Sequence, residues 1–155
     1  MILGCDFLKR HIIAVFVVIA ILVGCASASC AYIPGTEINP MASLYLDSYS
    51  VTLEPLGDGE MYIDMTVEGT TRMTKLGVVE MLIEERTPTG TWHEFDTLYG
   101  LDNPDFYGYN RITYIGEYYF EGTVGNEYRV TLLVFAQNAN GYDSGEITSV
   151  IAPCW

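Results

Sequence analysis

The chain predicts a single all-β domain, a seven-strand antiparallel β-sandwich, that follows an N-terminal hydrophobic segment. Beyond residue 44, short segments that alternate apolar and polar residues follow one another with turn residues between them. The clearest is "EMYIDMTVE", residues 60–68, which alternates strictly and places Met61, Ile63, Met65 and Val67 on one face. Removing the first 28 of the 155 residues leaves enough chain for one domain with its own core.

The N-terminal segment predicts export. Residues 12–23 form an uninterrupted apolar run behind the basic flank Lys9-Arg10-His11. A helix that spans a bilayer needs about 20 apolar residues, so this shorter run is typical of a secretory signal. Ala26-Ser27-Ala28 suits signal peptidase and predicts a signal peptide over residues 1–28. Leu22-Val23-Gly24-Cys25 resembles a bacterial lipobox, which predicts a signal over residues 1–24 and a lipid on Cys25. An uncleaved membrane anchor is the third alternative.

The net charge of the part expected to be exported limits the classes of partner that it can bind. The whole chain has 20 acidic and 7 basic residues, and residues 1–28 hold Asp6, Lys9 and Arg10. The remainder therefore carries 19 acidic and 5 basic residues, a net charge of −14. Such a chain repels phosphate backbones, which argues against nucleic acid and anionic lipid as partners. The acids are scattered rather than grouped, which is typical of a solvated surface.

The first elements follow from turn residues and alternation. Residues 29–43, with two prolines and a glycine, predict an extended tether or capping arm ahead of the domain at 44–155. The first strand is expected at 44–53, with one face formed by Tyr45, Tyr49, Val51 and Leu53. The strand at 60–68 follows the turn "PLGDG". The segment "GTTRMTKLG", residues 69–77, predicts a short helical turn from which Met73 and Leu76 pack.

The middle of the domain predicts a hairpin and a return strand. A strand is expected at 78–87 with Val79, Met81 and Ile83 inward, and Pro88-Thr89-Gly90 turns it into a strand at 91–99. Residues 101–109 are expected to form a loop. A strand at 111–121 follows, with one side formed by Ile112, Tyr114, Tyr118 and Phe120.

The last third carries a family resemblance. Its "GTVGNEYRVTLLVFAQ" places five residues on one face: Tyr128, Val130, Leu132, Val134 and Ala136. A turn with Gly125 ahead of Tyr128 resembles the corner of a fibronectin type III or immunoglobulin-like domain, and the hairpin "EERTPTGTWHEF" resembles that fold's middle hairpin. The resemblance implies that the Tyr128 hydroxyl bonds backward to the chain and pins the crossing between the sheets. The Trp that many such domains carry on the second strand is missing here.

A second likeness covers nearly the whole exported part. The stretches "INPMASLY", "VEGTTRMTKLG", "FEGTVGNEYRV" and "FAQNANGYDS" resemble a family of small secreted proteins from Gram-positive bacteria, known only as a domain of unknown function. The resemblance implies export and a compact β domain. It supplies no catalytic residues.

Little in the chain predicts catalysis. His93 is the only histidine beyond the signal, and no Gly-x-Ser-x-Gly or His-Glu-x-x-His motif is present. His93 is expected to be a surface strand residue. Neighbouring carboxylates such as Glu84 and Glu85 point to opposite faces of a strand, so they cannot share a substrate. We expect no catalytic residue, no cofactor and no metal, although a hydrolase using His93 stays open as a weaker alternative.

A calcium site and a disulfide are two further possibilities that stay open. Asp102, Asn103 and Asp105 offer oxygen ligands suited to calcium, but these residue types also form turns with their own backbone, and the turn is favoured. Cys30 and Cys154 form an even pair that would suit a disulfide in an exported protein.

Aromatic residues supply the candidate binding site. Trp92 and the loop residues Phe106, Tyr107 and Tyr109, beside Asp105 and Asn110, could stack on sugars or anchor a protein, whereas most rings of the chain are expected in the core or in cross-strand pairs. We expect a non-catalytic module, secreted or on the bacterial cell surface, that binds an extracellular protein or serves envelope structure. A small carbohydrate-binding module is the alternative.

Overall fold

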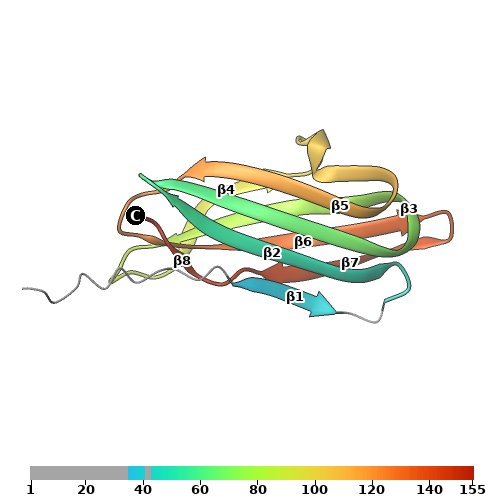
Figure 1. Ribbon diagram of the computed structural model, residues 1–155, viewed down its shortest axis with the longest axis horizontal. Helices are drawn as coiled ribbons and strands as arrows, with labels where there is room; N and C mark the ends of the chain where they lie inside the picture. The colour runs from blue at the N-terminus through green and yellow to red at the C-terminus, as the bar shows by residue number, and fades with distance from the viewer. Residues whose placement is uncertain (1–34, 41–42) are drawn as a thin grey trace, which may run out of the picture. The chain divides into compact units, whose positions relative to one another are not determined.

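The computed structural model describes residues 35–40 and 43–155, which form one curled antiparallel sheet of eight strands. The strands are β1 (Thr36–Pro40), β2 (Leu46–Gly57), β3 (Glu60–Arg86), β4 (His93–Tyr99), β5 (Tyr107–Glu121), β6 (Glu127–Asn138), β7 (Gly141–Thr148) and β8 (Ala152–Pro153), with a 3₁₀ turn η1 (Pro104–Phe106) before β5 (Figure 1). The all-β prediction is confirmed. Within the described ranges no helix has the length and apolar character to cross a membrane.

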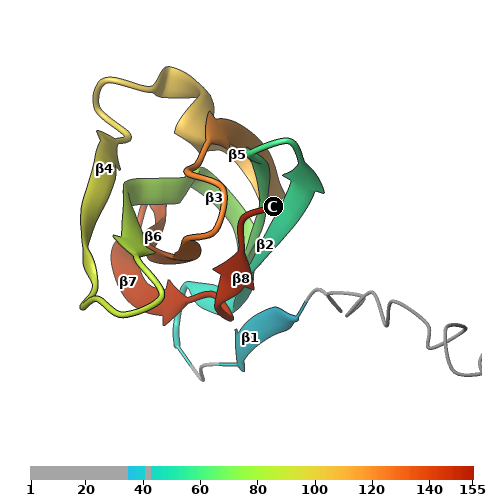
Figure 2. The same cartoon turned by 90° about the vertical axis from the view of Figure 1, so that its left-hand side faces the viewer.

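β3 is 27 residues long and organises the sheet. From Glu60 to Glu68 it lies between β2 and β5, and from Glu80 to Glu85 it lies between β4 and β6. The strand turns at its middle, and the sheet curls around one core, as the end-on view in Figure 2 shows. Because β3 merges two of the predicted strands, residues far apart along it belong to different parts of the sheet.

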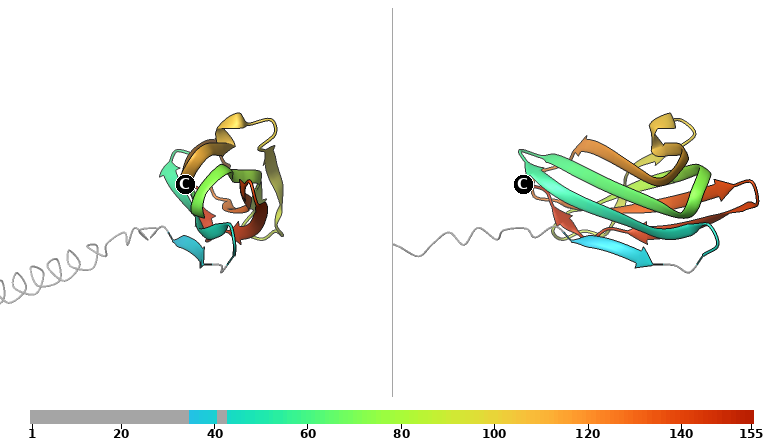
Figure 3. Two further views of the ribbon diagram at one scale, coloured as in Figure 1. Left: turned by 90° about the vertical axis from the view of Figure 1, so that its right-hand side faces the viewer. Right: turned by 45° about the vertical axis from the view of Figure 1, so that its right-hand side comes forward.

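The bend of β3 corrects one prediction. Residues 69–77, expected to form a short helical turn, are part of the strand (Figure 3). Met73 and Leu76 are fully buried all the same, because the bend turns both side chains inward. Gly77 permits it: its φ is +146°, and a Cβ there would lie 2.0 Å from the carbonyl oxygen of Phe106. The glycine serves a close approach of β3 to the end of η1 rather than a helix.

The alternation that predicts the core is confirmed on two strands. Inward residues of β3 and β6 are fully buried and join β2 in one cluster: Met61, Ile63, Met65, Val67, Tyr128, Val130, Leu132, Val134 and Ala136. Side chains of a strand alternate between its faces, so the intervening residues form the outer faces of the sheet.

Two side-chain predictions, Val79 facing inward and Ile112 sharing a side with Tyr114, do not match the burial because the strands are irregular. Val78 is fully buried and Val79 is not, since the register against β6 shifts between Val78 and Glu80 and the extra residue changes the phase. Ile112 is exposed, whereas Tyr114, Tyr118 and Phe120 pack on the core. The pairing of β5 with β3 jumps from Glu68 to Met73 at this point, so the alternation does not continue through Ile112.

The two ends of the domain also differ from the prediction. Within the expected tether at 29–43, residues 36–40 form β1, which pairs with β2 from Thr36 opposite Thr52 to Pro40 opposite Ser48. Residues 29–34 and 41–42 lie outside the described residues, as do the signal segment and the Cys25 lipidation site. At the other end, β8 pairs with the start of β6.

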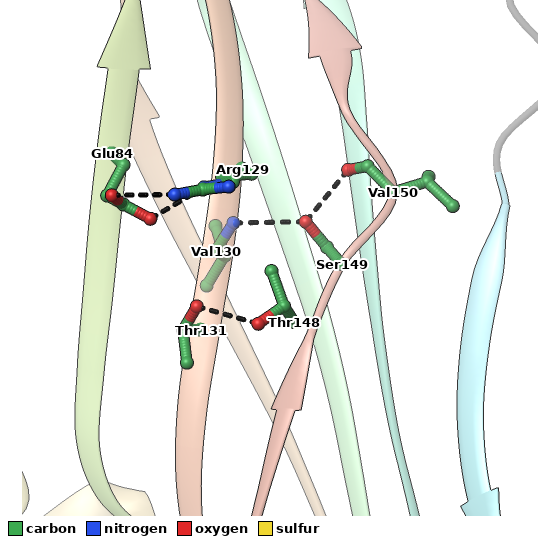
Figure 4. Close-up of polar contacts among 7 residues, drawn as sticks. All are labelled: Glu84, Arg129, Val130, Thr131, Thr148, Ser149 and Val150. Atoms are coloured by element: carbon green, nitrogen blue, oxygen red, sulfur yellow. Dashed lines mark hydrogen bonds and ion pairs between the residues drawn. The ribbon is translucent and has the colours of Figure 1, made fainter. Parts of the chain in front are cut away.

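Ser149 links the last two strands to β6. Its amide donates to the Val130 carbonyl at 2.8 Å. Its buried hydroxyl accepts from the Val130 amide at 3.0 Å and donates to the Val150 carbonyl at 2.8 Å (Figure 4). The side chain therefore satisfies the backbone where β7 stops and the ladder is interrupted.

Candidate functional site

Trp92 lies on the outer face of the sheet, at the hairpin between β3 and β4. Because Glu85 lies opposite His93 in the register of these strands, the residue before His93 comes next to Arg86. The guanidinium carbons of Arg86 and Arg129 lie 4.6 Å and 4.5 Å from the centroid of the half-buried indole. Both are within cation–π distance.

Two carboxylates hold these arginines in place. Arg129 donates from Nε and Nη2 to both oxygens of Glu84, at 2.6 Å and 2.9 Å (Figure 4). Arg86 donates from Nε to Oε2 of Glu127 at 2.8 Å, and its Nη2 contacts the same oxygen. Each pair joins residues directly opposite on β3 and β6. We call Glu84, Arg86, Trp92, Glu127 and Arg129 the Trp92 platform.

The electrostatics of the platform favour a fixed geometry. Hydrogen bonds to Glu84 raise the pKa of Arg129, so the guanidinium stays charged. The two arginines and two glutamates neutralise one another. Arg129 contacts both oxygens of Glu84, whereas both contacting nitrogens of Arg86 share one oxygen of Glu127. The result is an aromatic surface flanked by two ion pairs, with no net charge, on a strongly acidic domain.

The outer face continues from the platform along β6 and β7. Thr131 and Thr148 share a hydrogen bond of 2.9 Å, and the rings of Phe135 and Tyr142 lie 5.7 Å apart (Figure 4 shows the threonine pair). Leu133 is half-buried, and Tyr142 is 65% exposed. This face therefore combines one indole, two guanidinium groups and several apolar side chains.

A buried polar network lies beneath the platform. The Tyr128 hydroxyl donates to Oε1 of Glu85, which also accepts from the Asn126 amide at 2.8 Å, while Oε2 lies 3.1 Å from Nε2 of His93. The hydroxyl in turn accepts from the amide of Thr123 at 2.7 Å, five residues upstream. It bonds backward to the chain in the manner that the tyrosine-corner resemblance implies.

The protonation of this network follows from its contacts. Burial acts to raise the pKa of Glu85, but hydrogen bonds from Tyr128, Asn126, Thr123 and His93 outweigh it, so the pKa is lowered. Burial and the bond to Glu85 raise the pKa of Tyr128 to about 12. Tyr128 is fully buried, so the network connects β3 to β6 inside the fold.

The Phe106–Tyr107–Tyr109 group lies elsewhere. Phe106 is buried in η1, and Tyr109 is 56% exposed. The Lys75 ammonium lies over the Tyr107 ring, 3.5 Å from the ring centroid. A Cβ on Gly100, just past the end of β4, would meet the Tyr107 hydroxyl at 2.5 Å. Trp92 precedes the start of β4, whereas Tyr107 lies near its end, so about 20 Å of strand separates Trp92 from Tyr107. The four aromatic candidates therefore do not form one surface.

The Asp102–Asp105 segment forms a turn. The amides of Asp102 and Asn103 both donate to the Tyr99 carbonyl, and the Asn103 side chain donates to it at 2.9 Å. Over residues 35–40 and 43–155, no group of three or more His, Cys, Asp or Glu side chains is arranged to hold a metal ion.

The C-terminal cysteine is inside the fold. The Cys154 thiol is buried and lies 3.6 Å from the Gly59 carbonyl, and burial raises its pKa. Cys30 lies outside the described residues, so its pairing with Cys154 stays a prediction.

Sequence reasoning missed the four charged residues of the platform. The signal was present, because "EER" and "EYR" each place an acid two residues before an arginine, at 84–86 and at 127–129. When two such stretches pair antiparallel, each acid meets the arginine of the other strand. Only the register of β3 against β6 reveals it.

Comparisons with known proteins give no relative. No family model matches the chain, and no curated protein and no solved structure is significantly similar to it.

Proposed function

We propose that this chain is an exported, non-catalytic protein-interaction module and that the Trp92 platform is its binding surface. The observation that carries the proposal is the pair of guanidinium groups held against Trp92 by Glu84 and Glu127. Trp, Tyr and Arg are the residues that dominate binding energy at protein interfaces. A partner that binds here meets side chains that are already ordered, which lowers the entropy cost of association.

We further propose that the curled sheet is a sandwich of the fibronectin III or immunoglobulin-like class. The strand pairing supports this, because β3 belongs to two sets of paired strands, β1-β2-β3-β5 and β4-β3-β6-β7. The bend of β3 would stack these two sets as two layers. The bond from Thr123 to Tyr128 supports it as well. The likeness to small secreted proteins of Gram-positive bacteria stays part of the same proposal.

Export rests on the N-terminal segment and is tested by mass. Intact mass spectrometry of the membrane and supernatant fractions of the native host separates the alternatives. A lipid-modified chain that begins at Cys25 in the membrane, or a chain that begins at Ser29 in the supernatant, supports export. An uncut chain in the cytoplasmic fraction contradicts it.

Photo-crosslinking tests the binding surface. A photoreactive phenylalanine analogue at Thr131, two residues from Arg129 on the same strand face, should capture one protein species in the native host. The same analogue at the exposed Asn140, in the turn between β6 and β7, is the control. Capture should fall at least about tenfold in Trp92→Ala and stay unchanged in Tyr99→Ala, an exposed aromatic at the far end of β4. Equal capture from both positions, or capture that survives Trp92→Ala, rejects the platform as the site.

A carbohydrate-binding module is the second proposal, and the exposure of Tyr109 favours it. Trp92 favours it less, because guanidinium groups already lie against its ring. Glycan-array binding that disappears in Tyr107→Ala and Tyr109→Ala would support the carbohydrate function. Binding lost only in Trp92→Ala would place a glycan on the platform instead.

A further inference from the structure

A second outer face of the domain carries tyrosines between carboxylates. It is formed by β2, the first part of β3 and β5, whose intervening residues fill the core. In the register of β3 against β5, Glu60 lies opposite Glu121, Tyr62 opposite Tyr119 and Asp64 opposite Glu117. We call these six residues the acid–tyrosine ladder. The two rings lie 4.9 Å apart, between two directly opposed pairs of carboxylates.

The ladder adjoins a hollow in the surface. The hollow has a volume of about 580 Å³ and is lined by Leu56, Asp58, Glu60, Tyr119 and Glu121 together with Gly57 and Phe120. Leu56 and Tyr119 are 51% and 53% exposed, so the lining offers apolar surface beside three carboxylates. An exposed aromatic ring beside carboxylates is the setting that favours an ammonium or guanidinium group.

The charges of the ladder have no counterpart in the described part of the chain. None of its four carboxylates, nor Asp58, forms an ion pair there. No Lys or Arg occurs in residues 46–68 or 112–121, which build this face. Like charges directly opposite on neighbouring strands destabilise a sheet. Burial and the Glu117 charge raise the pKa of Asp64, as expected where carboxylates repel each other.

We infer that this face docks an extended, cationic segment of a partner protein, with basic residues four apart and a flat side chain midway. The geometry selects the spacing, because the two carboxylate pairs are four residues apart along β3, or about 13 Å. An extended segment presents side chains i and i+4 on one face at the same distance. Its middle residue would then lie over Tyr62 and Tyr119. A second copy of this acidic domain would be repelled.

Peptide binding tests the inference with the exported protein. A labelled peptide that repeats Lys-Ser-Tyr-Ser is compared, at about 0.15 M salt, with a peptide of the same composition whose lysines are grouped. The repeating peptide should bind at least about tenfold more tightly. Tyr119→Ala, which leaves the net charge unchanged, should weaken binding at least about fivefold. The double variant Glu60→Gln/Glu121→Gln should weaken it about tenfold or more.

A matched charge control makes the result specific. Glu80→Gln/Glu146→Gln removes the same two charges from the other outer face and should change the dissociation constant less than about twofold. Equal losses in both double variants, or no effect of Tyr119→Ala, would mean attraction by net charge and would overturn the inference. So would a lack of peptide binding, or a preference for calcium or spermine over the peptide. Trp92→Ala should leave peptide binding unchanged, so this test fails or succeeds independently of the platform.

Discussion

Removal of one hydroxyl in Tyr128→Phe should cost the domain about 2.5 kcal/mol of stability. The side chain is fully buried, so the ring stays and the change is confined to the hydroxyl. It loses a bond to the ionised Glu85, worth about 2 kcal/mol for a charged acceptor, and the bond from the Thr123 amide, which water can partly replace. The midpoint of thermal unfolding should fall by about 10 °C for a domain of this size.

The penalty should depend on pH. The pKa of Glu85 is lowered from its ordinary value of 4.5 in the folded protein. Its ionised form therefore stabilises the fold above the pKa of unfolded Glu, and this contribution disappears as the pH falls through the folded-state pKa. Urea unfolding from neutral pH to about pH 3 should show the difference between wild type and Tyr128→Phe shrinking, with the urea dependence unchanged.

Tyr114→Phe provides the matched control. Tyr114 is also buried, but its hydroxyl donates to a neutral acceptor, the Asp105 carbonyl, at 3.0 Å. We expect a loss of about 1 kcal/mol that does not change over the same pH range. A Tyr128→Phe penalty below about 0.5 kcal/mol, or one as insensitive to pH as the control, would refute the role given to Glu85.

Three further changes test the fold. Gly77→Ala should lower the free energy of urea unfolding by more than about 3 kcal/mol, because the added Cβ would collide with a carbonyl oxygen. The control Gly125→Ala, also at positive φ but with no atom within 4 Å of the added Cβ, should lower it by about 1 kcal/mol. Equal losses in the two variants would contradict the close approach at Gly77. Ser149→Ala leaves a buried amide of β6 without its partner and should lower the unfolding free energy by about 2 kcal/mol, and a loss under about 0.5 kcal/mol would argue against this role. Asp64→Asn removes the repulsion between Asp64 and Glu117 and should stabilise the domain by about 0.5 kcal/mol at neutral pH. The gain should disappear once the pH is well below the raised pKa of Asp64, because the carboxyl group is then protonated in the wild type as well. Destabilisation at neutral pH would contradict the repulsion.

Alternation explains what could be predicted from the sequence. The faces of residues 60–68 and 128–136 follow from a period of two, which depends only on strand geometry. The bend at 69–77 defeats the same reasoning, since Met73 and Leu76 are three residues apart, a spacing that also suits a helical turn. The close approach of Gly77 to the Phe106 carbonyl favours a bent strand over a helical turn, and the two residues are far apart in the sequence.

The candidate site shows the same limit. Trp92 can be selected from the sequence as a large aromatic on a hairpin, but its surroundings depend on strand register. A shift of one residue between β3 and β6 would turn Arg129 to the core and separate it from Glu84. Tyr62 and Tyr119 form a cross-strand pair, and the carboxylate pairs on either side of it become apparent only from the register.

The continuity of β3 governs how the domain comes apart. A molecule with two separately built layers could lose one and keep the other, and a protease would then leave a stable remnant. Here the same backbone segment supplies a central strand to both sets of strands, so detaching β2 and β5 frees the segment on which β4 and β6 depend. Unfolding should accordingly proceed in a single step, and a protease should find either the intact domain or a fully accessible chain. The lack of a half-open state would in turn protect the domain against degradation, because proteases cleave the accessible chain.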